Sequence, residues 1–177
     1  MEKIMWLVLG GTLIIASLFA GRSERARLVA RFALGVLFLV FGALVKLLYL
    51  VTDWDSFAEF GDMSQFALVR ETWASLVVPN TGFFIGLLIL GEATAGILVL
   101  SGGRRMEAGL VLLLAFHVGL LFFGWWLWLY VVPMLGALTL LLRAERRHSH
   151  EAAIPRHGAG RGSAPVDGRH RSRALSS

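Results

Sequence analysis

The stretch RFALGVLFLVFGALVK, residues 31 to 46, decides the fold class of this chain, because it is almost wholly apolar between two cations. At about 100° per residue, its charged ends and three residues between them fall along one stripe of an α-helix. The positions on this stripe are Arg31, Gly35, Phe38, Gly42 and Lys46. A long apolar helix with charged ends is typical of a membrane span.

The composition of the whole chain agrees with this interpretation. Of its 177 residues, 56% are hydrophobic and 16% are charged, and the mean hydropathy is +0.70. A soluble domain carries about 25% charged residues and needs them to cover its surface. We therefore expect an integral membrane protein. The chain has no cysteine, which excludes disulfides, thiolate metal sites and intrinsic dithiol redox chemistry.

Five apolar stretches are expected to be transmembrane helices, since about 20 residues cross the roughly 30 Å hydrocarbon layer. The last two form one apolar run, in which we expect a turn at Gly124 and the adjacent Trp125 and Trp126. The five stretches are residues 4–20, 28–51, 81–101, 106–124 and 125–142. The expected fold is therefore an all-α integral membrane protein.

We expect this fold to have three parts. Residues 1–27 form an N-terminal transmembrane helix and a basic connection, and residues 28–143 form a four-helix transmembrane bundle with an outer loop at 52–80. Residues 144–177 form a disordered basic tail. In the outer loop, apolar residues at helical spacing between residues 66 and 77 predict an amphipathic segment, which Pro79 should end.

The basic residues set the expected orientation. They cluster in the first and third connections and after the fifth span, whereas the loop 52–80 has one arginine against five acidic residues. This places the N-terminus outside and the C-terminus in the cytoplasm. An alternative is that the first span is a signal peptide cleaved near Arg22, but cleavage would leave the arginine-rich connection outside. The net charge of +5 resides in residues 143–177, where it favours anionic lipid as a partner and gives no reason to expect nucleic acid.

Three ionisable residues lie at membrane depth, away from the first turns of the expected spans, where a charge costs at least about 2.5 kcal/mol, and each is a functional candidate. Lys46 either pairs with Glu92 or extends to the outer headgroups. Glu92 either holds two helices together or takes part in proton or ligand chemistry. His117 is either an interhelical hydrogen-bond partner or a ligand. The pattern assigns no catalytic residue and no metal site.

Other candidates concern packing and the outer ends of the helices. Arg31 is expected to anchor its helix at the cytoplasmic headgroups. Five glycines are expected to let helices approach closely, namely Gly35, Gly42, Gly82, Gly86 and Gly96. Four aromatics are expected to form either an interfacial belt or the wall of an apolar pocket. They are Trp125, Trp126, Trp128 and Tyr130.

The chain resembles the DoxX family of small bacterial membrane proteins over roughly residues 28 to 143. The residues of RFALGVLFLVFGALVK that match the first core helix of the family are Arg31, Gly35, Gly42 and Lys46. The residues of GEATAGILVLSGGRR that match the second core helix of the family are Glu92, Gly96, Gly102 and Gly103. The stretch AFHVGLLFFGWWLWLYVVP is similar to a subset of the family. The resemblance implies a four-helix bundle in the bacterial plasma membrane.

The resemblance also implies a function. Some DoxX relatives are subunits of a thiosulfate:quinone oxidoreductase, and others join membrane complexes that handle thiol or oxidative stress. We therefore expect an accessory membrane subunit without intrinsic catalysis or an intrinsic cofactor. Its expected ligand is a quinone or another apolar small molecule, and its expected partner is a soluble or membrane oxidoreductase. The rival hypotheses are a lipid or isoprenoid carrier and a purely structural membrane component.

Overall fold

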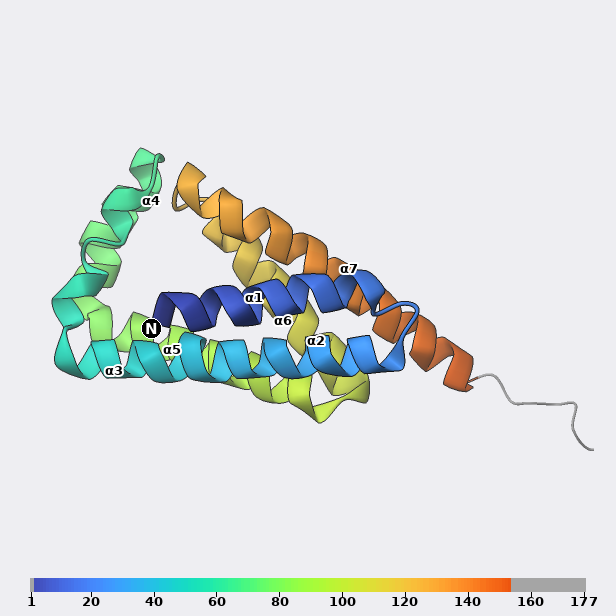
Figure 1. Ribbon diagram of the computed structural model, residues 1–177. Helices are drawn as coiled ribbons and strands as arrows, with labels where there is room; N and C mark the ends of the chain where they lie inside the picture. The colour runs from blue at the N-terminus through green and yellow to red at the C-terminus, as the bar shows by residue number, and fades with distance from the viewer. Residues whose placement is uncertain (1, 154–177) are drawn as a thin grey trace, which may run out of the picture.

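The computed structural model describes residues 2–153, and the regular structure in that range is helical (Figure 1). Helix α1, Glu2–Phe19, is joined by a short turn to α2, Glu24–Val36. The Ser23 side chain begins α2 by accepting a hydrogen bond from the Ala26 backbone N–H. A π-helical segment, Leu37–Leu44, then continues without a break into α3, Val45–Thr52. The stripe that begins at Arg31 therefore lies on one long helix, whose middle is wound more loosely than an α-helix.

The expected outer loop, residues 52–80, which is called the outer segment below, is a series of short helical turns. Two 3₁₀ turns come first, at Trp54–Phe57 and Gly61–Met63. The amphipathic segment is then observed as α4, Ala67–Thr72, followed by a second π-helical segment, Trp73–Val77.

Pro79 does not end the helical run, contrary to the sequence-based expectation. It lies in the 3₁₀ turn Val78–Asn80, which leads directly into α5, Thr81–Ser101. Proline is tolerated in the first turn of a helix because its missing N–H would have no partner there. The chain bends at this place, and α4 rises away from the axis of α5 (Figure 1).

Two tight turns arrange the remaining helices. Gly102 and Gly103 have φ values of 77° and 57°, a region that glycine enters without steric cost, and they connect α5 to α6, Gly103–Leu120. The second turn passes through Gly124 to the 3₁₀ turn Trp125–Leu127 and then α7, Trp128–Ala153. This confirms the turn predicted around Gly124.

Residues 144–153 are helical and so differ from the predicted disordered tail. Helix α7 continues to Ala153, and residues 154–177 lie outside the described part of the chain. Buried Glu145 pairs with Arg27 of α2, with 3.5 Å between Oε2 and Nε, and Arg146 pairs with Glu107 of α6 at 3.6 Å. These ion pairs attach the last turns of α7 to two other helices, which the composition of the segment alone did not indicate.

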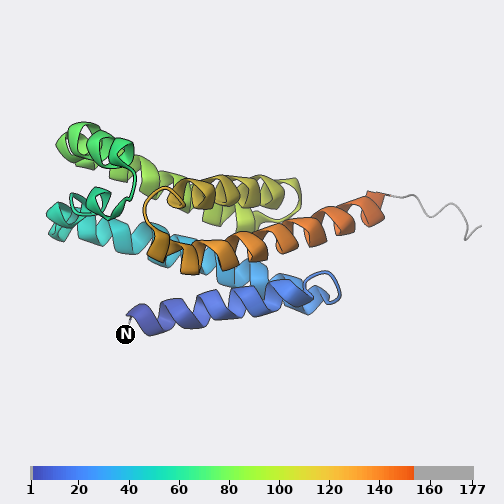
Figure 2. The ribbon, with the colours of Figure 1, turned by 90° about the horizontal axis from the view of Figure 1, so that it is seen from above.

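The helices pack in a chain of neighbours. The long α2–α3 helix lies along α5, α5 lies along α6, α6 contacts α7, and α7 contacts α2. Helix α1 packs on α2 and α7 at one side of the assembly (Figure 2). Several side chains at these contacts are fully buried, including Leu34, Val99, Leu110 and Leu138.

Three helical stretches among the described residues are long and apolar enough to cross a membrane. They are Glu24–Thr52, Ala67–Ser101 and Trp125–His150. The apolar part of α1, Leu7–Phe19, is shorter, and α6 carries three charged residues in its first turns. Large apolar side chains are exposed along the helices, as at Phe83 and Leu129, which are 68% and 80% exposed. Length, composition and surface together indicate an α-helical membrane protein.

Candidate functional site

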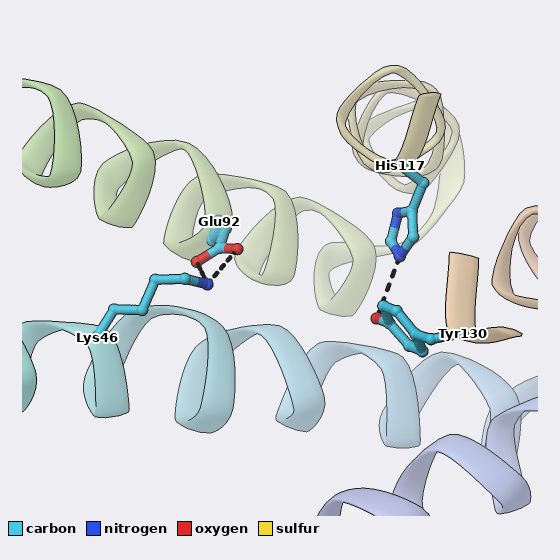
Figure 3. Close-up of polar contacts among 4 residues, drawn as sticks. All are labelled: Lys46, Glu92, His117 and Tyr130. Carbon is cyan, nitrogen blue, oxygen red and sulfur yellow. Dashed lines mark hydrogen bonds and ion pairs between the residues drawn. The ribbon is translucent and has the colours of Figure 1, made fainter. Parts of the chain in front are cut away.

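Lys46 of α3 and Glu92 of α5 form an ion pair inside the helical assembly. The Lys46 Nζ lies 2.7 Å from each carboxylate oxygen of Glu92, and Figure 3 shows the lysine side chain extended towards the carboxylate. The Glu92 side chain is 4% exposed and that of Lys46 is 29% exposed. Of the two alternatives predicted for Lys46, the structure therefore shows the ion pair with Glu92 and not the extension to the headgroups.

The ion pair belongs to a close antiparallel crossing of the long α2–α3 helix with α5. At the other end of this crossing, the Arg31 guanidinium donates a hydrogen bond to the Leu100 carbonyl, in the last turn of α5. Arg31, expected to anchor its helix at the headgroups, thus contacts the end of a neighbouring helix, where a cation interacts favourably with the helix dipole.

Three of the predicted packing glycines lie at this crossing. A Cβ atom on Gly42 would lie 3.1 Å from Oε2 of Glu92, and one on Gly96 would lie 2.9 Å from the Leu39 side chain. Gly35 contacts the Leu100 side chain so closely that a Cβ there would overlap it. The small residues allow the two backbones to approach to the distance at which Lys46 reaches Glu92.

Gly82 and Gly86 do not pack against another helix within the described chain, and this part of the prediction is wrong. A Cβ atom at either position would meet nothing within 4 Å. The buried face of α5 carries Ile85, Ile89 and Glu92 instead, so the two glycines lie on the outward side of the helix. Their GxxxG spacing indicated small residues on one face but not which way that face points.

A cavity of about 600 Å³ lies beside the ion pair. It is lined by the α2–α3 helix, the outer segment, α5, α6 and the beginning of α7. Its walls are mostly leucine and aromatic side chains, and its charged lining residues in the described chain are Lys46 and Glu92. The arrangement therefore combines a large apolar space with one polar point, as small-molecule sites commonly do.

The two π-helical segments both contribute to this cavity. Leu37 and Gly42 both line it although they are five residues apart. In an α-helix, residues at i and i+5 point about 140° apart, whereas the wider π turn brings them to the same face. Trp73 and Val77, the ends of the second π-helical segment, line it as well. Periodicity based on the α-helix places Leu37 and Gly42 on different faces, whereas it already places Trp73 and Val77, four residues apart, on one face.

Three aromatic rings that line the cavity pack against one another beside the outer segment. Phe60 and Trp73 come from the outer segment and Phe123 from the turn after α6, and their ring centroids are 5.0 to 5.7 Å apart. The buried Ser64 hydroxyl joins these two regions by donating to the Phe122 carbonyl at 2.6 Å. Phe60 was not predicted as a site residue, because nothing local in the loop sequence indicates where its ring points.

The four predicted pocket aromatics divide into two pairs. Trp126 and Tyr130, four residues apart, line the cavity. Trp125 and Trp128 are not among its lining residues and are 68% and 44% exposed, which agrees with the alternative prediction of an interfacial belt. The Trp128 indole N–H donates to the Leu121 carbonyl.

His117 lies behind Tyr130 and is fully buried. Its Nδ1 is 2.7 Å from the Leu113 carbonyl, and since a carbonyl can only accept, Nδ1 carries the proton. In the neutral ring, Nε2 then accepts from the Tyr130 hydroxyl on α7, 3.2 Å away (Figure 3). His117 is therefore an interhelical hydrogen-bond partner whose two nitrogens are both engaged. The described residues contain no cluster of three or more metal-ligating side chains.

The fold and this site define a class, namely an α-helical membrane protein with an apolar cavity beside a buried ion pair. Comparisons with family models, with curated proteins and with solved structures find no match to this chain. The resemblance to the DoxX family therefore stays a prediction.

Proposed function

We propose that this protein is a DoxX-like membrane protein of the bacterial plasma membrane that binds a quinone in the cavity beside Lys46 and Glu92. In this proposal, α2–α3, α5, α6 and α7 form a four-helix transmembrane bundle to which α1 is added. The N-terminus lies outside, and the basic C-terminus lies in the cytoplasm against anionic lipid. The observation that carries the proposal is the single ion pair in an otherwise apolar cavity of about 600 Å³.

The chemistry of the cavity fits a quinone ring. The volume lies within the range of about 300 to 1,000 Å³ that is usual for small-molecule sites. The aromatic and leucine side chains offer an apolar surface to a flat ring. An ammonium group has three N–H donors, of which the Lys46 group directs two at Glu92. The third can donate to a quinone carbonyl, so the ring is fixed by one hydrogen bond and by apolar contact.

We propose that the bound quinone serves a partner oxidoreductase. The chain has no cysteine, so thiol-dependent electron transfer would have to occur on another protein. The chain would then be an accessory subunit that presents the quinone at the membrane. The partner class follows from the resemblance to redox-linked relatives.

A binding titration tests this proposal. The full chain in lipid nanodiscs is titrated with a short-tailed ubiquinone, and quenching of tryptophan fluorescence reports binding, because Trp73 and Trp126 line the cavity. We expect saturable binding that Lys46→Met weakens about tenfold or more, since a hydrogen bond to a charged group is worth about 1.5 to 3 kcal/mol. Leu47→Met, at an exposed neighbour on the same helix, is the control and should bind as the unchanged protein does.

The rival carrier hypothesis gives a different result. The apolar walls of the cavity would also accept an isoprenoid without a polar head, but such a ligand has no acceptor for Lys46. Equal affinity of Lys46→Met and the unchanged protein, or a stoichiometric isoprenoid found by mass spectrometry of the purified protein, would favour the carrier. Absence of saturable quinone binding would refute the proposal.

A further inference from the structure

A second cavity of about 320 Å³ adjoins the first on its α5–α6 side. Four residues line both cavities, namely Phe84, Leu88, Glu92 and Phe116. The two spaces are therefore next to each other, and the carboxylate of the ion pair lies where they meet. We call the second cavity the side groove.

The side groove is apolar and lies towards the outer surface of the helices. Its rim includes Leu87 of α5 and Leu112 of α6, which are 58% and 42% exposed. Apart from Glu92, its described lining residues are apolar. Gly91 lies in its wall, and a Cβ atom there would meet nothing within 4 Å, so the space beside this glycine is open.

The side groove offers an approach that differs from the outer end of the main cavity. At the outer end, the rings of Phe60, Trp73 and Phe123 pack together, and Ser64 ties the outer segment to the turn after α6. At the side groove the exposed leucines of two candidate lipid-facing helices form the rim. In a bilayer this rim faces hydrocarbon, where an apolar chain passes without loss of hydrogen bonds.

We propose that the side groove holds the isoprenoid tail of the ligand whose ring lies beside Lys46, and that the ligand enters sideways from the bilayer. This inference rests on the proposed quinone function and narrows it to tailed, membrane-dissolved quinones. The ring occupies the main cavity, the chain passes between the side chains that line both spaces, and the end of the tail stays in lipid. Glu92 at the junction turns its carboxylate to Lys46 and so leaves the groove wall apolar.

Two probes and a matched pair of variants test this inference. The full chain in nanodiscs is titrated with a tailed ubiquinone and with the same benzoquinone ring lacking the tail. Gly91→Leu places an isobutyl group in the side groove, whereas Gly86→Leu adds the same group to α5 at an open position that lines neither cavity. We expect Gly91→Leu to weaken binding of the tailed probe about tenfold, the value of roughly two buried methylene groups. Binding of the tail-less ring should not change, and Gly86→Leu should affect neither probe.

Leu87→Trp supplies a second variant that narrows the groove from its exposed rim and so leaves the packed helix contacts intact. It should reproduce the selective loss of the tailed probe. Equal binding of the tailed probe by the unchanged chain and both groove variants would overturn the inference while leaving quinone binding in place. A phospholipid acyl chain retained in the groove at full quinone occupancy, seen by native mass spectrometry, would overturn it as well. Failure of both probes to bind the unchanged chain would instead overturn the proposed function, and the inference with it.

Discussion

The two ends of the stretch from Arg31 to Lys46 meet the same neighbouring helix in different ways. At the inner end, Arg31 donates to a backbone carbonyl of α5, and Leu34 beside it is fully buried. At the outer end, Lys46 pairs with a carboxylate of α5, and the space beside it is a cavity. A cation that binds the end of a helix stabilises the packing of two helices. A cation that pairs with a carboxylate beside a cavity keeps an N–H donor that can bind another group.

The contact of Arg31 with α5 therefore supports the packing of the helices, whereas the ion pair of Lys46 belongs to the candidate site, although both residues lie on one long helix. The inner half is packed with fully buried side chains, such as Leu34, Val99 and Leu138. The outer half keeps an apolar space around a charged pair, although such a pair is costly at membrane depth. We therefore expect substitutions in the inner half to change stability and those in the outer half to change binding.

The largest expected effect contrasts two leucines. Leu34→Ala in the packed inner half should lower the free energy of unfolding by about 2 to 5 kcal/mol, because it leaves an unfilled space among close-packed helices. Leu120→Ala enlarges a cavity that already exists and should cost less than half as much. Equilibrium unfolding in mixed detergent micelles measures both. Equal losses would show that the two halves are packed alike.

The next effect concerns the ion pair. A double-mutant cycle with Lys46→Met and Glu92→Gln should give a coupling energy of about 0.6 to 1.7 kcal/mol, the range of polar pairs within membranes. The same unfolding measurement applies to the four proteins of the cycle. Strictly additive single effects would contradict the contact of 2.7 Å between Nζ and the carboxylate.

A smaller effect is expected where the outer segment meets the turn after α6. Ser64→Ala removes the hydrogen bond from the hydroxyl to the Phe122 carbonyl and should cost about 0.5 to 1.5 kcal/mol. Faster amide hydrogen exchange in α4, with unchanged exchange in α2, would show that the loss is local. Ser75→Ala, at an exposed serine that bonds only within its own helical turn, is the control. Equal exchange in the two variants would show that Ser64 does not join the outer segment to the turn after α6.

The smallest effect is expected at Ser17 of α1, in the packed inner half. Its buried hydroxyl has no hydrogen-bond partner in the described structure, and an unpaired buried hydroxyl opposes folding. Ser17→Ala should therefore leave the free energy of unfolding unchanged or raise it by up to about 1 kcal/mol. A clear loss of stability would mean that the hydroxyl bonds to a neighbour after all.

Sequence reasoning predicted the features that depend on hydropathy and on local backbone chemistry. The helices at 28–51 and 81–101 and the turn at Gly124 follow from apolar length and from a glycine before two tryptophans. Close approach of another helix at Gly35 and Gly42 follows from small residues on one stripe, whereas the contact of Arg31 with the end of α5 was not predicted. The predicted features are patterns within one stretch of sequence, and so one chain is enough to indicate them.

The remaining features depend on tertiary contacts. The π-helical segments at 37–44 and 73–77 both line the cavity. Their apolar residues are compatible with α-helical and with π-helical turns, so the sequence did not indicate the winding. The outward face of Gly82 and the extension of α7 to Ala153 depend on which neighbours lie alongside. For the site, the spacing of four residues between Trp126 and Tyr130 indicated that their side chains share a face. No such spacing indicated that Phe60 lines the same cavity.

The π-helical segment makes the number of residues in this helix part of the binding site. Each π turn accommodates one residue more than an α turn, so a deletion within residues 37–44 would let the segment rewind as α-helix. Because the number of turns would stay the same, positions beyond the deletion would stay on the same face of the helix, and Lys46 would still point towards Glu92. A deletion within residues 32–36 of α2, where no turn holds an extra residue, would instead rotate every later position by about 100° relative to Arg31. Lys46 would then leave Glu92, so the place of a single-residue deletion along this helix decides whether the ion pair survives.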